Sequence, residues 1–166
     1  RNGQIGVCIS TQIGRYVAPE TNMPGWNSPD IAWSITQAQL AWYRVMEDHG
    51  QMTQITNRVE LNAHVDLWKT AEDTSELPIG YILSLEGADS IINLGYLEKA
   101  YAYGLRALGP AHYGPGRYDP GTGSEGGLEA GCKDLLLEMQ RLGIVLDVTH
   151  LTDDGFWEAL DIYSGP

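Results

Sequence analysis

Hydrophobic residues along this chain fall into two alternating patterns. Continuous apolar runs predict strands buried on both faces, as in a parallel sheet, within residues 6–16, 79–85, 105–108 and 144–148. Longer stretches with apolar residues at helical spacing predict helices over residues 29–49, 59–71, 94–103, 128–142 and 153–162. Strands that alternate with helices form right-handed βαβ units, so we expect an α/β fold with a parallel sheet.

The sequence also predicts the starts and the buried faces of several helices. Ser28 is the expected N-cap before Pro29 in the first helix, and Thr152 is the expected N-cap of the last. The expected buried stripe of the first helix consists of Ile31, Ile35, Ala38, Trp42, Val45 and Met46. That of the second consists of Leu61, Val65 and Trp68. The stripe of the helix over 128–142 consists of Leu128, Cys132, Leu135, Leu136, Met139 and Leu142.

The number of predicted strands limits the possible architectures. Four strands are too few to close a barrel, which needs about eight. The pattern therefore indicates either a section of a larger barrel or a small open sheet.

Composition excludes some classes of partner. The chain has 10 Lys and Arg residues against 22 Asp and Glu residues, a net charge of -12. This charge argues against a nucleic acid or an anionic membrane surface as a partner. No apolar run is long enough to span a bilayer, so no membrane contact is expected from this segment. Cys8 and Cys132 lie in apolar contexts and are expected to be buried, reduced thiols, which favours a cytoplasmic location.

Three polar residues follow predicted strands directly: Glu86, His112 and His150. The carboxyl ends of parallel strands lie on one side of the fold, so these residues can converge. Alternation along Ile82, Ser84 and Glu86 places these side chains on one face of the strand, and the same is expected for Leu146, Val148 and His150. A carboxylate and two imidazoles form a ligand set for zinc. A capping carboxylate and two ordinary loop histidines are the alternative, which the spacing alone slightly favours.

Other candidate residues fit structural roles better. His64 and Asp66 form a His-x-Asp pair, but on a helix these positions lie about 200° apart and cannot reach one ion. Both are expected at the surface or its boundary. Cys132 lies in the middle of an apolar helix face and is not expected to act as a nucleophile. Residues 113–127, rich in Gly and Pro, form no phosphate-binding motif, and a loop of this length is usually functional or mobile.

Three longer stretches resemble one known family. They are ILSLEGAD at 82–89, LGPAHYGPGRYDPGTGSEGGL at 108–128 and EMQRLGIVLDVTHLTDDGFWEALD at 138–161. Their order and content are similar to the membrane dipeptidase (renal dipeptidase-like) family of metallopeptidases, with its bacterial branch the closer match. The resemblance implies a (β/α)8 TIM barrel with two zinc ions at the carboxyl ends of its strands. It also implies hydrolysis of dipeptides, in many members with a D-residue at the carboxyl side, by a metal-activated hydroxide.

The resemblance implies a role for each candidate residue. Glu86 matches the carboxylate that bridges the two zinc ions, and His150 matches a ligand of one zinc. His112 matches a catalytic histidine that is not a ligand but binds the substrate and stabilises the tetrahedral intermediate. The remaining ligands, the substrate-binding arginine and the acid/base lie outside the stretch that this chain matches. Residues 1–166 are thus expected to be one segment of a catalytic barrel domain, about strands 2–5, incomplete at both ends and inactive alone.

Two other functions remain open at this point. One is another amidohydrolase-type metal hydrolase acting on a cyclic amide, an ester or a lactam. The other is a metal-free, non-catalytic relative or binding module. The expected partner is a dipeptide, and a homodimer is compatible with the resemblance because dimers are common in the family.

Overall fold

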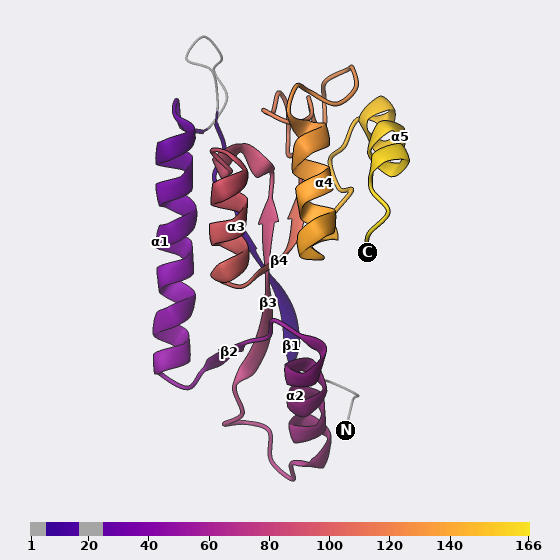
Figure 1. Ribbon diagram of the computed structural model, residues 1–166. Helices are drawn as coiled ribbons and strands as arrows, with labels where there is room; N and C mark the ends of the chain where they lie inside the picture. The colour runs from indigo at the N-terminus through magenta and orange to yellow at the C-terminus, as the bar shows by residue number, and fades with distance from the viewer. Residues whose placement is uncertain (1–5, 17–24) are drawn as a thin grey trace.

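The computed structural model describes residues 6–16 and 25–166 (Figure 1). The strands are β1 (Val7–Gln12), β2 (Met52–Gln54), β3 (Ile79–Glu86), β4 (Leu105–Gly109) and β5 (Val145–Leu146). The helices are α1 (Pro29–Asp48), α2 (Arg58–Thr70), α3 (Leu94–Ala102), α4 (Cys132–Leu142) and α5 (Asp153–Ile162), with a short 3-10 helix, η1 (Ala88–Ser90). The predicted alternation of strands and helices is confirmed; β2 was not predicted.

The strands pair in parallel in the order β1-β3-β4-β5. Strand β1 pairs along one edge of β3. The other edge of β3 is therefore shared by two strands: β2 lies beside Ile79–Tyr81, and β4 lies beside Leu83–Glu86. Along β1, β3, β4 and β5 the order follows the sequence without reversal. A doubly wound sheet reverses its order at a switch point, whereas a barrel does not. The topology is therefore that of a barrel section.

One face of the sheet carries the hydrophobic core. Tyr81, Leu83 and Leu85 of β3 point into a cluster with buried residues of the helices. These helix residues include Leu40 of α1, Leu97 of α3, Leu135, Leu136 and Met139 of α4, and Ala159 of α5. Four helices thus cover the same face, as in the outer layer of a barrel.

The opposite face is open within the described residues. Ile9 of β1 pairs with Ile82 and is 60% exposed, and Val145 of β5 is 44% exposed. The prediction that the first strand is buried on both sides is therefore wrong for the described part of the chain. Among the described residues, four helices cover one face of the sheet, and α2 packs against the other face only near Gly80.

Helix α1 begins as predicted but buries a different face. Ser28 is its N-cap and accepts a hydrogen bond from the Asp30 amide. The expected stripe is wrong, since Trp42 is 55% exposed, while Ala32, Thr36 and Leu40 are buried. The cause is a close approach to the chain after β1: a Cβ on Gly14 would lie 2.4 Å from the Ala32 carbonyl oxygen. At this point α1 presents Ala32 and Thr36, whose small side chains let the helix come this near.

Helix α2 lies beside the amino-terminal ends of β1 and β3 (Figure 1). Its expected inner residues Leu61, Val65 and Trp68 are half-buried. The prediction that His64 lies at the surface or its boundary is wrong: it is buried, with Nε2 3.0 Å from the Gly6 oxygen and 3.1 Å from the Gly80 nitrogen. Position 80 must be glycine for this packing, because a Cβ there would lie 2.9 Å from Nε2.

Helix α4 begins at Cys132, four residues later than predicted, so Leu128 lies outside it. Gly131, in the left-handed conformation at φ 87°, precedes the helix. Cys132 is fully buried, and this burial raises the pKa of its thiol to about 12. Both cysteines are free thiols, as predicted, although Cys8 is only half-buried. No helix in the described part of the chain has the length and hydrophobicity needed to cross a membrane.

Candidate metal centre

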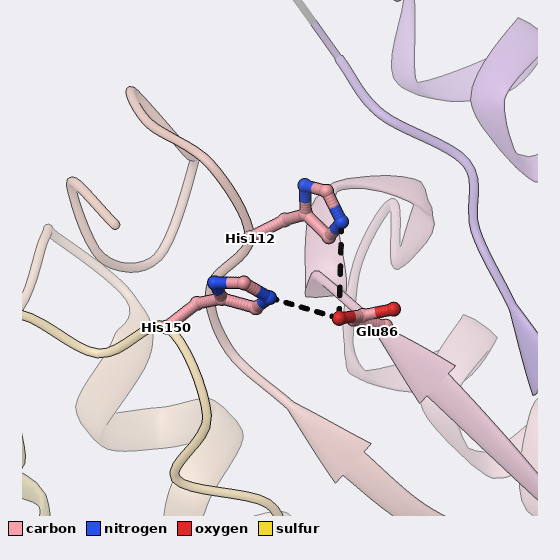
Figure 2. A group of neighbouring side chains, drawn as sticks. All are labelled: Glu86, His112 and His150. Carbon is pink, nitrogen blue, oxygen red and sulfur yellow. Dashed lines mark hydrogen bonds and ion pairs between the residues drawn. The ribbon is translucent and has the colours of Figure 1, made fainter. Parts of the chain in front are cut away.

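The three candidate residues converge at the carboxyl ends of the strands. Glu86 is the last residue of β3, His112 follows β4, and His150 follows β5. One ligand atom from each lies within 4.8 Å of the others. Figure 2 shows both imidazole rings directed towards the Glu86 carboxylate. The predicted convergence of these side chains is confirmed as geometry.

A single carboxylate oxygen lies next to both rings. Glu86 Oε1 is 2.9 Å from His150 Nε2 and 3.8 Å from His112 Nε2. The three side chains are between 16% and 26% exposed, so the cluster is half-buried but open to a ligand. Together they offer one carboxylate and two imidazole nitrogens to a common point.

Strand alternation places Glu86. Tyr81, Leu83 and Leu85 point into the helix-covered core, so Glu86 continues the opposite row, as predicted. The chain then turns at Gly87, which has φ 79°. A Cβ at Gly87 would lie 3.2 Å from the Cβ of His112, so glycine allows the end of β3 to lie against this histidine.

His112 is fixed by the Gly-rich loop (residues 113–127). The Thr122 amide donates to the His112 carbonyl oxygen at 3.0 Å. Burial lowers the pKa of the His112 imidazole; Arg15 and His150 lower it further, while Glu86 opposes these effects. A neutral imidazole carries one N–H, and Nδ1 is buried without a hydrogen-bond partner in the described structure. The proton is therefore best placed on Nε2, which faces Glu86.

His150 reaches the site in a way that the sequence pattern did not predict. The expected alternation along Leu146, Val148 and His150 is wrong, because β5 ends at Leu146. The chain turns instead, with the Thr149 amide donating to Asp147 Oδ1 at 2.9 Å, and His150 has φ 70°. This left-handed conformation is uncommon for residues other than glycine. A strained conformation of this kind persists where its surroundings hold it.

Two residues absent from the sequence prediction support His150. Thr122 Oγ1 lies 2.9 Å from His150 Nδ1. Asp119, fully buried, accepts hydrogen bonds from the amides of Gly121 at 2.8 Å and Thr152 at 3.3 Å. Burial raises the pKa of Asp119, and these hydrogen bonds oppose the rise. Asp119 therefore joins the Gly-rich loop to the segment that carries His150.

The donor set fits a zinc ion. Zinc in proteins binds carboxylate oxygen and imidazole nitrogen, and catalytic sites use few protein ligands and leave a position open. Glu86 and His150 present such donors towards one another, and the second nitrogen of His150 has its own partner, as is usual for a histidine ligand. His64 and Asp66 do not join the site: His64 is buried near the amino-terminal ends of the strands and Asp66 is exposed.

Comparison with known proteins adds the family. The sequence profile described as membrane dipeptidase (peptidase family M19) matches residues 27–166. The chain belongs to this family. The membrane dipeptidase resemblance is thereby confirmed, and so is the fold class, an α/β section of a TIM barrel with parallel strands. The roles of Glu86, His112 and His150 stay predictions.

Individual relatives are distant. A protein from Acinetobacter calcoaceticus, named "Uncharacterized protein in PQQ-III 3'region", is 29% identical over 101 residues, 55% of this chain and 32% of that protein. The crystal structure of dipeptidase AC, a family M19 metallopeptidase, matches with a TM-score of 0.76 and 20% identity over 95% of this chain and 47% of its own.

A Rhodobacter sphaeroides metallopeptidase, liganded with a phosphinate mimic of the dipeptide L-Ala-D-Ala, matches with a TM-score of 0.76 and 19% identity. The match covers 95% of this chain and 50% of that one. The chain thus spans about half, or less, of the length of these proteins.

Proposed function

We propose that this chain is part of a zinc-dependent dipeptidase that hydrolyses the peptide bond of dipeptides, including those with a D-residue at the carboxyl side. The observation that carries the proposal is the convergence of Glu86, His112 and His150 at strand ends in a member of the membrane dipeptidase family. The ligand of the Rhodobacter sphaeroides protein, a mimic of L-Ala-D-Ala, supports the choice of substrate.

Glu86 and His150 are the residues of this chain that would hold the metal. Glu86 would hold the zinc ions through its carboxylate, and His150 would hold one through Nε2. When bound, zinc polarises a carbonyl oxygen and lowers the pKa of a water molecule to near neutrality.

His112 has a different role in the proposal. Its Nε2 lies 3.8 Å from Glu86 Oε1, farther than that of His150, and its lowered pKa keeps the ring neutral with a proton on the site-facing nitrogen. A neutral N–H next to the scissile bond can donate to the oxygen on which negative charge develops. His112 thereby binds the substrate and stabilises the tetrahedral intermediate.

A cavity of about 530 Å³ lies beside the loops that carry Thr122 and His150 and is lined by residues 121–126 and 151–154. This volume is within the range of about 300–1,000 Å³ that small-molecule sites occupy. Glu86, His112 and His150 do not line this cavity, so the choice of a dipeptide rests on the family and on the ligand of the Rhodobacter sphaeroides protein.

Substitution of Glu86 in the whole protein tests the metal site. Glu86→Gln removes the negative charge of the carboxylate that would hold the metal, so we expect zinc content and dipeptide hydrolysis both to fall. Glu98→Gln is the matched control, because Glu98 is on the exposed surface of α3, where it pairs with Arg141. Wild-type zinc content and activity in Glu86→Gln would refute the assignment.

Substitution of His112 tests the division of labour. We expect His112→Ala to keep its zinc while kcat falls by about 10²–10³-fold, the usual loss when an oxyanion donor is removed. Loss of zinc instead would make His112 a ligand.

A panel of L,L- and L,D-dipeptides together with cyclic amides, esters and lactams tests the substrate class. Hydrolysis of the cyclic amides, esters or lactams but not of the dipeptides would identify another amidohydrolase. Dimerisation and a cytoplasmic location stay predictions.

A further inference from the structure

The His150 ring is held at both of its nitrogens. Nε2 lies 2.9 Å from Glu86 Oε1, and Nδ1 lies 2.9 Å from Thr122 Oγ1. Figure 2 shows the Nε2 side of the ring turned towards Glu86 and the other nitrogen turned away from it. The contact with Thr122 joins residues 28 positions apart in the sequence, on two different loops.

The position of Thr122 is set by its backbone. Its amide donates to the His112 carbonyl oxygen at 3.0 Å, and its carbonyl oxygen accepts from the Gly114 amide at 3.0 Å. The preceding residue, Gly121, has φ 78°, and a Cβ there would lie 2.1 Å from the His112 carbonyl oxygen. With the backbone fixed on both sides and a branched Cβ that restricts χ1, the hydroxyl has little freedom to move.

The two loops are also fixed relative to each other. The buried Asp119 carboxylate accepts hydrogen bonds from two amides. One is that of Gly121, next to Thr122, and the other is that of Thr152, two residues after His150. The Thr152 hydroxyl in turn donates to the Gly126 carbonyl oxygen at 2.6 Å. The Thr122–His150 contact is therefore part of a hydrogen-bond network, formed with Asp119 and Thr152, that joins the two loops.

The chemistry of a histidine ligand requires a specific proton position. An imidazole that binds a metal through Nε2 carries its proton on Nδ1, and the partner of Nδ1 must then accept a hydrogen bond. Without metal, Nε2–H can donate to the Glu86 carboxylate, and the partner of Nδ1 must then donate. A hydroxyl can do either, whereas a carbonyl or carboxylate can only accept.

We propose that Thr122 is a positioning residue that holds the His150 ring with Nε2 towards Glu86 and with the proton on Nδ1 when metal binds. Because His150 is a metal ligand only under the proposed function, this role of Thr122 rests on that function. A purely structural role would instead make Thr122 important for folding and irrelevant to metal affinity.

The test compares variants of the whole protein in their affinity for Zn²⁺, measured by competition with a chelator. Thr122→Val keeps the shape of the side chain and removes the hydroxyl, so we expect zinc affinity to fall by about 10–100-fold, as for other partners of histidine ligands. Thr122→Ser keeps the hydroxyl and should stay within about threefold of the wild type. Thr149→Val, at an exposed position beside His150, is the matched control and should bind zinc normally.

A second readout is independent of affinity and of activity. In the zinc-loaded protein, ¹⁵N NMR of His150 should show a protonated Nδ1 in the wild type and in Thr122→Ser, with the Nδ1 proton exchanging faster with solvent in Thr122→Val. Wild-type zinc affinity and proton exchange in Thr122→Val would overturn the proposal. If valine disturbs the loop, serine still decides: a tenfold loss of zinc affinity in Thr122→Ser would equally overturn it.

The His150→Ala variant separates this proposal from the proposed function. If His150→Ala binds zinc as tightly as the wild type, His150 is no ligand and the proposed metal site fails. If His150→Ala loses zinc while Thr122→Val does not, the metal site stands and only the role of Thr122 fails.

Discussion

Gly155 gives a prediction in which two physical effects have opposite signs. It is the third residue of α5, and an alanine in a helix is usually more favourable than glycine by about 1 kcal/mol. A Cβ at this position, however, would lie 1.9 Å from Asp119 Oδ2 and 2.9 Å from Thr152 Oγ1. Asp119 is 0% exposed, so its carboxylate has no free space into which to move.

The magnitude follows from the hydrogen bonds that the carboxylate would lose. Asp119 accepts from the Gly121 amide at 2.8 Å and from the Thr152 amide at 3.3 Å. A hydrogen bond to a charged group contributes about 1.5–3 kcal/mol, so disrupting two outweighs the gain of about 1 kcal/mol in helix propensity. We expect Gly155→Ala to lower the free energy of unfolding by about 2–5 kcal/mol.

Gly95→Ala is the matched control. Gly95 is the second residue of α3, and its new Cβ would meet only the side chain of the exposed N-cap residue Asn93, at 3.2 Å. We expect this variant to be neutral or more stable by up to about 1 kcal/mol. Urea unfolding of the whole protein, followed by circular dichroism, measures both.

The two glycine variants should therefore change stability in opposite directions. If Gly155→Ala is as stable as Gly95→Ala, the carboxylate of Asp119 can move without cost, and its hydrogen bonds do not hold the two loops together. If Gly155→Ala is destabilised, its zinc affinity should also fall, because the same hydrogen-bond network supports Thr122 and His150.

Three further predictions concern residues away from the metal centre. His64→Ala should lower the free energy of unfolding by about 1–3 kcal/mol, since it removes a buried polar contact to Gly6, and should leave zinc content unchanged. Asp66→Ala, at an exposed position of the same helix, should change stability by less than about 0.5 kcal/mol in the same denaturation assay. Cys132, with a pKa of about 12, should stay protonated and resist alkylation by iodoacetamide at pH 8 in the native protein, while denaturation should expose it; rapid modification of native Cys132 would contradict its burial.

Local chemistry explains the parts of the fold that the sequence predicts well. The strand over 79–85 is observed as β3 and the helix over 153–162 as α5, because apolar periodicity and the N-caps Ser28 and Thr152 act within a few residues. Motifs similar to the family identified Glu86, His112 and His150, whose positions at strand ends are observed. Strand alternation was sufficient to orient Glu86.

Long-range contacts determine the features that the sequence did not predict. The face that α1 buries depends on its close approach to Gly14, and the burial of His64 depends on the space that Gly80 leaves. His150 reaches Glu86 by a left-handed turn, which no hydrophobic period encodes.

The sequence by itself determined which segments form strands and helices and which residues are candidates for a metal site, because periodicity, caps and motifs depend on neighbouring residues. Only the tertiary structure showed the contacts of Thr122 with His150 and of Asp119 with Thr152. Asp119 lies 33 positions from Thr152, and Thr122 lies 28 from His150. Contacts over such separations leave no periodic signal in the chain. They form only when the loops that follow β4 and β5 come together at the carboxyl ends of the strands.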